Sequence, residues 1–517
     1  MAADSQKPNI MPLERYTVNF ITSYPEEGLT GRRKILTPVK QITAANVRDV
    51  LGNALSVHAR NAAEITYLYD VYRGRQDVLK KTKQVRENIN HKVVVNRANE
   101  IVTFKTAFLL NEPVQYVSHG GDDSVSEKVD RLNEMMRAED KAAKDKEIVD
   151  WMHICGVGER LVQPDPELEY EGAPFNIETL DPREAFCIYN SGIGRKKIGG
   201  VILQEDEDGE PMAFVYTPIS MFIVRGDSVT EEPHMLGAVP LIEYLNNEAR
   251  IGAFEVVLPV LNSINQLESD ACDAVTDFVN GFDVFQNCEI SNDTYGELTL
   301  GGKAISIKTV VPGMEAKVYR IFSELNQSGV QTRIDDQTDA YLEICGMPNR
   351  NGGSSTSDTG TAVLYRDGFW AAGSRAKDTA TMFKRAEREF DKIVMRICDT
   401  RADLGLKISD FEAKFPFGNL QNLQSLAQTF TELLSNDYVH PASAYEVGAA
   451  LFKDSNEALR MGLAWHDKVT RDQEESLGEA VNNARTEALR NMRQGDTANE
   501  SPDDSTVYTD ESEATDA

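Results

Sequence analysis

Residues 251–281, IGAFEVVLPVLNSINQLESDACDAVTDFVNG, decide what kind of fold this chain has. The apolar side chains of this stretch recur with a helical period, at Phe254, Val257, Leu258, Leu261, Ile264, Ala271, Val275 and Phe278. A period near 3.6 residues kept for about eight turns predicts an amphipathic helix roughly 45 Å long. The sequence therefore predicts a fold built on long amphipathic helices.

The same stretch carries three acids, Asp270, Asp273 and Asp277, on one helix face. Like charges four residues apart cost an isolated helix a few tenths of a kcal/mol, so a compensating partner is one interpretation and an ordinary solvated face is the other. The candidate partner is a run of eight Lys or Arg within residues 73–97 of a neighbouring subunit, and this run alternatively forms a solvated cationic helix. Its first six cations are Arg73, Arg75, Lys80, Lys81, Lys83 and Arg86.

The rest of the chain mixes helical and strand patterns, which makes the predicted class α+β and mainly helical. Apolar periodicity predicts further helices over residues 47–70, 98–108, 125–156, 322–345, 361–399 and 420–469, the last broken at His440-Pro441. Short β-rich runs separated by turn formers predict an antiparallel meander over 158–247 and a small β element over 282–320. The first forty residues predict an irregular arm, and the acidic residues after Arg493 predict a disordered tail.

Composition limits the functions that are possible. The chain has 517 residues and a net charge of -29, which excludes phosphate binding spread over the whole surface. No window reaches the apolar length of a membrane-spanning helix, and the first thirty residues lack a signal-peptide core, so we expect a soluble protein without a membrane partner. The six cysteines are far apart and are expected to be reduced thiols.

No catalytic or cofactor motif is present in the sequence. The seven histidines form neither HExxH nor a close pair, and the Gly-rich stretch 192–200 favours a hairpin over a phosphate loop. Lys303 follows two glycines but precedes Ala304, which departs from a Walker A loop. We therefore expect neither an enzyme nor a cofactor or metal, while a hydrolase whose carboxylates meet only in three dimensions stays open.

The order of several segments resembles the portal proteins of tailed phages, in particular the SPP1-type portal family. The resemblance runs from about Tyr69 to Leu463. The segments that carry it are YRGRQ from Tyr72, KVVVNRANEIVTFKTAFLLNEPVQY from Lys92, AVPLIEYLNN from Ala238, VLPVLNSINQLESDACDAVTDFVNGF from Val257, and ICGMPN through SDTGTAVLYR from Ile344. None is a catalytic signature, and the family assignment depends on their order and spacing.

The resemblance implies a portal fold with wing, stem, clip and crown regions. It would assign residues 1–45 to an N-terminal arm, 46–250 to the wing, 251–281 and 321–346 to two stem helices, and 282–320 to the clip between them. Residues 347–360 would be the tunnel loop, 361–415 a long wing helix with a strand link, 416–470 the crown, and 471–517 a C-terminal helix with an acidic tail.

The resemblance also implies a role and partners. Subunits would form a ring, typically of twelve, at one capsid vertex of the virion after assembly in the host cytoplasm. Double-stranded DNA would pass through the channel, driven by the terminase large subunit, and the major capsid, scaffolding and head-completion or adaptor proteins would bind the ring. The acids of residues 270–277 would then face the lumen or another subunit. A self-assembling structural or scaffold protein without a DNA-conducting role is the alternative.

Two further sets of residues would have roles in such a ring. The tunnel loop would touch DNA through small polar side chains and one cation, namely Asn349, Arg350, Asn351, Ser354, Ser355, Thr356 and Ser357. The clip would contact terminase and adaptor proteins through Lys303, Lys308 and Lys317.

Overall fold

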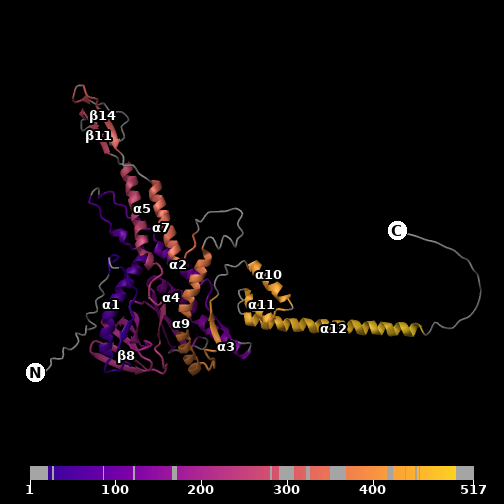
Figure 1. The fold of residues 1–517 in the computed structure, drawn as a ribbon. Coiled ribbons are helices and arrows are strands. Elements are labelled where there is room, and N and C mark those ends of the chain that lie inside the picture. The colour runs from indigo at the N-terminus through magenta and orange to yellow at the C-terminus, as the bar shows by residue number, and fades with distance from the viewer. Residues whose placement is uncertain are drawn as a thin grey trace, which may run out of the picture. The chain divides into compact units, whose positions relative to one another are not determined.

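The computed structural model is a mixed α and β structure with mainly antiparallel sheets (Figure 1). It describes residues 21–25, 28–84, 87–119, 123–165, 172–279, 282–289, 308–311, 313–321, 327–349, 368–415, 423–436, 438–448, 451–452 and 455–495. Contacts within the chain separate two compact units, Met1–Leu426 and Ala427–Ala517.

The helices of the described chain are α1 (Val47–Tyr72), η2 (Asp77–Lys80), α2 (Arg97–Leu109), α3 (Asp123–Ala138), α4 (Lys141–Cys155), η3 (Glu255–Val257), α5 (Leu258–Val279), α7 (Gln327–Cys345), α9 (Phe369–Arg401), α10 (Leu423–Leu434), α11 (Pro441–Val447) and α12 (Ser455–Gly495). The strands are β1 (Ile35–Thr37), β2 (Gln115–Ser118), β3 (Val157–Pro164), β4 (Phe175–Leu180), β5 (Ala185–Asn190), β6 (Lys197–Glu205), β7 (Pro211–Tyr216), β8 (Ser220–Arg225), β9 (Ser228–Pro233), β10 (Leu241–Leu245), β11 (Phe282–Gln286), β12 (Cys288–Glu289), β13 (Lys308–Thr309), β14 (Lys317–Ile321) and β15 (Phe411–Lys414).

The meander predicted over residues 158–247 is present but divides into two sheets. Strands β5 to β9 follow one another in a six-stranded sheet, with β1 added at its edge parallel to β5. Strand β10 returns to pair with β3, and β4 completes a three-stranded sheet. The prediction of an irregular N-terminal arm was wrong at β1, because Ile35 is buried against the sheet while its pairing partner, Ile188, lies far along the chain.

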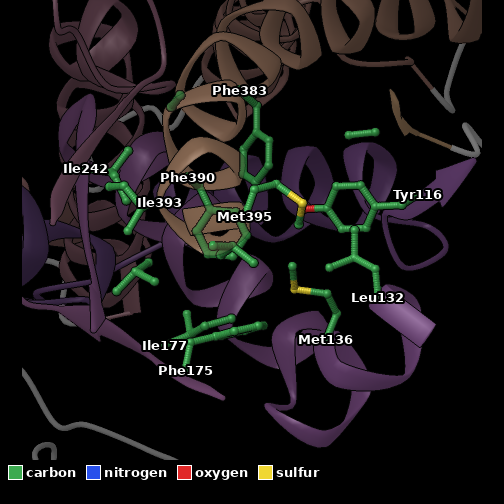
Figure 2. Packing of buried hydrophobic residues seen from close by; sticks show 14 of the residues in the cluster. Tyr116, Leu132, Met136, Phe175, Ile177, Ile242, Phe383, Phe390, Ile393 and Met395 are labelled. Carbon is green, nitrogen blue, oxygen red and sulfur yellow. The ribbon is translucent and has the colours of Figure 1, made fainter. Parts of the chain in front are cut away.

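The largest core cluster packs α9 against α3, α4 and the three-stranded sheet. Figure 2 shows Phe383, Phe390 and Ile393 of α9 among the apolar side chains of this cluster. The seam predicted for a long helix ending near residue 399 is confirmed, since its apolar positions are the buried side of α9.

A balanced ion network lies within this core. Lys141 Nζ is 2.7 Å from Asp145 Oδ2 and 2.6 Å from Glu387 Oε1, and Arg160 Nη2 is 2.8 Å from Asp145 Oδ1. The hydroxyls of Tyr116 and Tyr244 donate to the two oxygens of Glu387, at 2.8 Å each. All these side chains are buried, so the network joins α4, α9 and three strands only while each charge keeps its partner.

The single helix predicted over residues 125–156 was wrong. The structure has two helices there, because Asp140 adopts the left-handed conformation at φ 50° between α3 and α4. Aspartate tolerates this conformation better than most residues, and no Gly or Pro marks the break in the sequence. Helix α4 ends at Gly156, where φ is 86° and a Cβ atom would lie 2.4 Å from the Arg250 carbonyl group.

The helix predicted over residues 251–281 begins later than expected. A short 3-10 turn, η3, precedes α5, whose second residue is Pro259. Proline has no amide hydrogen and fits only the first turn of a helix, which fixes this starting point. Helix α7 packs beside α5, and the chain between them forms the ribbon β11–β14 and the short pair β12–β13 (Figure 1).

The second unit contains most of α10, together with α11 and α12. The helix break predicted at His440-Pro441 is confirmed, since His440 caps α11 and Pro441 is its first residue. The helical pattern over residues 420–469 and the C-terminal helix expected within residues 471–517 meet in one element, because α12 runs without a break from Ser455 to Gly495. The acidic tail, residues 496–517, lies outside the described residues.

Candidate functional site

The feature that stands out is the way in which the basic segment, residues 73–97, lies along α5. Alternate amide groups of this segment donate to side chains of the helix: His91 N to Asp273 Oδ1 at 2.7 Å, Val93 N to Ser269 Oγ at 2.9 Å, and Val95 N to Asn265 Oδ1 at 2.8 Å. The three acceptors are four residues apart and are buried. Three successive turns of α5 are therefore bound to one segment of chain.

The geometry of the two elements explains why this register fits. Four residues of an α-helix rise about 6 Å, and two residues of an extended chain span about 6.6 Å. Side chains four apart on a helix can therefore meet every second amide of a chain that runs alongside. The acceptors replace the partners that a neighbouring strand would otherwise supply.

Asp273 is the electrostatic centre of this contact. Its Oδ2 lies 2.8 Å from Lys81 Nζ and 2.9 Å from Lys83 Nζ, and its Oδ1 lies 2.8 Å from His91 Nδ1. Burial alone would raise the pKa of Asp273, but the hydrogen bonds from Lys81, the His91 amide and Lys83 outweigh burial and hold the pKa well below its usual range. Asp273 is thus a charged carboxylate held by cations.

The predicted acids and cations meet, but they do so within one chain. Asp270 is 51% exposed and accepts from Lys81 at 2.7 Å, so it lies at the rim of the contact. Asp277 belongs to α5, and the environment of its side chain lies outside what the structure describes. These acids were expected to face solvent, a lumen or a neighbouring subunit, whereas the structure gives Asp270 and Asp273 partners in the same chain.

The other predicted cations divide between ordinary contacts and undescribed positions. Arg75 lies 3.3 Å from Asp70, Lys80 lies 3.3 Å from Asp77, and the Arg73 guanidinium lies 5.6 Å from the centre of the Tyr69 ring. Arg86 is outside the described residues. Among the predicted cations that the structure describes, only Lys81 and Lys83 therefore form ion pairs with acids of α5.

The first turn of the α5 region is fixed by a buried ion triad. Arg32 Nη2 lies 2.6 Å from Glu255 Oε1 and 3.0 Å from Glu64 Oε2, which joins the N-terminal segment and α1 to η3. Burial raises the pKa of Glu255 against the opposing effect of Arg32 and of the Gly252 amide, which donates to Glu255 Oε2 at 2.8 Å. Sequence periodicity gave no sign of this triad, because its members lie far apart along the chain.

Helix α5 also faces α7 across a groove of about 640 Å³. Its lining residues are His91, Glu268, Ala271, Cys272, Val275, Thr276, Gln327, Ser328, Val330, Gln331 and Ile334. Outside the groove, Gln337 Nε2 of α7 donates to Ser263 Oγ of α5 at 2.8 Å. The pair is thus joined by packing and by this hydrogen bond.

Only part of the predicted loop and insert can be located. Asn349 donates from Nδ2 to Asp339 Oδ1 of α7 at 2.8 Å, while the other six predicted loop residues lie outside the described chain. Lys317 is exposed on β14, 3.4 Å from Glu315, and Lys308 belongs to β13. Lys303 lies outside the described residues.

One polar cluster deserves comparison with a catalytic site. Thr106 Oγ1 donates to Asp150 at 2.7 Å and lies 3.1 Å from His153 Nδ1. Burial lowers the pKa of His153 to about 3, and both Thr106 and His153 are buried. The buried, neutral imidazole and the Asp150 carboxylate both contact the same hydroxyl, which ties α2 to α4. In the described chain no group of three His, Cys, Asp or Glu could hold a metal ion.

A comparison with protein families supports the resemblance that the order of the sequence segments indicated. A family model described as phage portal protein, SPP1 Gp6-like, matches residues 52–446. No curated protein matches the chain. A solved structure titled "Virion of native gene transfer agent (GTA) particle" is similar over 75% of this chain and 93% of that chain, with 9% identity and a TM-score of 0.38. A TM-score of this size does not establish a shared fold. None of the described helices is long and apolar enough to span a bilayer.

Proposed function

Because the chain belongs to the SPP1 Gp6-like family of phage portal proteins, we propose that its copies form a closed ring at one vertex of the capsid and that the genome passes through the ring. The ring would serve packaging and, later, ejection of the DNA. It would hold no catalytic site and no cofactor, and an ATP-driven terminase would supply the work.

The observation that carries this proposal is the reinforced helix pair α5–α7. Helix α5 is bound over three turns by the basic segment, fixed at its start by the Arg32 triad, and packed against α7. A channel wall has to keep its shape while a stiff, charged polymer moves past it. Side chains bound at successive turns give a helix that resists bending and sliding.

The regions of the proposed ring follow this helix pair. Helices α5 and α7 would be the stem, residues 282–320 the clip at its end, and residues 347–360 the tunnel loop. Residues 46–250 and 361–415 would form the wing, and residues 416–470 the crown. Twelve subunits would close the ring, as is typical of the family.

Charge favours a conduit over a DNA-binding protein. Each phosphate contact by Lys or Arg adds affinity that falls with salt, so a channel lined with such contacts would hold its cargo. The net charge of -29 and the pairing of Lys81 and Lys83 with Asp270 and Asp273 leave few cations for such contacts along α5. An electronegative wall lets the duplex slide.

The partners proposed for the ring are the terminase large subunit, head-completion or adaptor proteins, and the major capsid and scaffolding proteins. Lys303, Lys308 and Lys317 of the clip would offer cations to the first two. Assembly would take place in the host cytoplasm and the mature ring would reside in the virion.

Particle images test the proposal most directly. Purified full-length chain should sediment as a large closed oligomer and show rings with an axial hole by negative staining, and it should hydrolyse no ATP without added motor. A monomer or small oligomer with robust ATP turnover would contradict the proposal. Rings that support packaging equally well after deletion of residues 350–358 would remove the tunnel-loop role, and rings that never take up DNA would favour a scaffold.

A further inference from the structure

The six-stranded sheet has two ends of opposite character. At one end the β5–β6 loop, residues 190–197, carries Arg195 and Lys196 on an exposed tip. At the other end the β6–β7 loop, residues 205–210, has the sequence EDEDGE and carries five acids with no cation. Strand β6 connects the two loops, and its nine residues separate them by roughly 30 Å.

The cationic end also exposes large apolar side chains. Ile193 at the loop tip and Met235 after β9 are fully exposed, and Ile219 in the β7–β8 turn is 66% exposed. The strand register brings all three to the same end of the sheet. A single exposed apolar residue is ordinary on a protein surface, whereas three at one end of one sheet indicate a contact surface.

Most charges of the two loops have no ion-pair partner in the described part of the chain, although Lys197 at the base of the β5–β6 loop pairs with Glu389 at 2.7 Å. Among the described residues, Arg195 and Lys196 form no ion pair, and the tip at Gly194 has no atom within 4 Å of the position of a Cβ. In the acidic loop, Asp206 Oδ1 accepts from the amides of Asp208 and Glu210 at 3.0 and 2.9 Å, which shapes the turn and leaves the carboxylates of the loop without a cation. We call these surfaces the cationic end (residues 190–197 with Ile219 and Met235) and the acidic loop (residues 205–210).

We propose that the cationic end of one subunit docks against the acidic loop of the next copy of this chain. The inference depends on the proposed ring and names the surfaces that would close it. The opposite charges of the two ends favour this head-to-tail contact, while two cationic ends or two acidic loops would repel each other. A contact between different surfaces of identical subunits generates a ring when its rotation closes.

This contact would set the direction and register in which neighbouring subunits join, while helices α5 and α7 would form the wall of the channel. Exposed ion pairs each contribute little, so the attraction alone is modest, and the apolar side chains of the cationic end give it a core that excludes water. The strong effect is negative: placing like charges across the contact opposes assembly. Charge reversal is therefore the sharpest perturbation.

The test uses two reversed variants of the full chain. Arg195→Glu with Lys196→Glu makes the cationic end acidic, and Glu207→Lys with Asp208→Lys takes the acidic loop from a net charge of -5 to -1 and places two cations at its centre. Each variant alone should lower the fraction of chain in rings at least tenfold, measured by sedimentation and negative staining at low salt. An equimolar mixture of the two, and a single chain carrying all four changes, should both recover rings, because the introduced acids of the one surface then face the introduced lysines of the other.

A matched control separates this contact from a general charge effect. Asp130→Lys with Glu134→Lys changes the net charge by the same amount as the acidic-loop variant, on the exposed face of α3. It should form rings as the unchanged protein does. All variants should keep the melting temperature of the unchanged protein, since both loops are exposed.

The outcomes distinguish this inference from the proposed function. An unchanged protein that forms no ring contradicts the proposed function. Rings in the unchanged protein and in either reversed variant alone overturn the docking contact and leave the portal role standing. Loss of rings in both variants without recovery in the mixture or in the four-change chain also overturns it.

Discussion

Replacing Asp273 by alanine should release the basic segment from α5. Asp273 accepts from Lys81, Lys83 and both the amide and the ring of His91. A hydrogen bond to a charged group contributes about 1.5–3 kcal/mol, but Lys83 is 28% exposed and can regain water, and Lys81 keeps Asp270. We therefore expect a local loss of about 3 kcal/mol, which corresponds to two of these hydrogen bonds at the weak end of the range.

Limited proteolysis measures this loss because the segment is rich in trypsin sites, at Lys80, Lys81 and Lys83. Cleavage tracks the population of the open segment when opening and closing are fast. A change of about 1.4 kcal/mol corresponds to a factor of ten, so Asp273→Ala should raise the cleavage rate within residues 80–92 roughly a hundredfold. The cleaved bonds are identified by mass spectrometry of the fragments.

Asp270→Ala is the matched control. It lies three residues away on the same helix and contacts Lys81, but it is half exposed, and an exposed ion pair contributes at most about 1 kcal/mol. Its cleavage rate should rise by no more than about fivefold. Equal rates for the two variants would refute the reasoning, since they would mean that Asp273 is no more important than a surface acid.

Three further predictions concern the framework that carries the helix pair. Lys141→Met removes one cation from the buried carboxylates of the core network and should lower the free energy of unfolding by about 3–5 kcal/mol, which lowers the melting temperature by roughly 6–10 °C. Lys146→Met, on the exposed side of α4, should leave the melting temperature unchanged. Burial lowers the pKa of His58 to about 4, so the neutral imidazole contributes fully to the free energy of unfolding above pH 6.5, and this contribution is lost as the pH falls toward 4. At pH 5 the loss is about 2 kcal/mol, and His58→Gln should reduce the drop in melting temperature between pH 7.5 and pH 5. An undiminished drop would exclude His58 as a source. Gly156→Ala meets a backbone carbonyl group and should cost at least about 3 kcal/mol, whereas Gly209→Ala has a similar positive φ but open space and should cost about 1 kcal/mol, so equal melting temperatures would contradict the clash.

Local patterns predicted the elements whose stabilising contacts leave a periodic trace in the sequence. Helix α1 was expected over residues 47–70 and spans Val47–Tyr72, because its buried side recurs every three or four residues. Strand β1 was missed because three residues give no period and its partner in β5 is distant. The break at Asp140 was missed because a left-handed aspartate resembles any other polar helix residue in sequence.

The candidate site was half visible from the sequence. A search for charge singled out Asp270, Asp273 and the lysines, but it placed the cations on a neighbouring subunit, whereas Lys81 and Lys83 pair with these acids within one chain. It overlooked Asn265 and Ser269, which bind the same segment through uncharged acceptors. Polar residues four apart on the otherwise apolar side of a long helix are the signal that would have found them, because a buried polar side chain needs a partner.

The register of the basic segment along α5 bears on how the proposed wall would carry load. The hydrogen bonds at Asn265, Ser269 and Asp273 recur about once per turn of the helix, and all join the same segment. A force along the axis would therefore load them together, and none can be opened fully while the others hold. A bend would instead strain the two outermost bonds first, at Asn265 and Asp273, and Asp273 is the one with added ionic contacts. The charge thus reinforces the end of the contact that lies toward the β11–β14 ribbon.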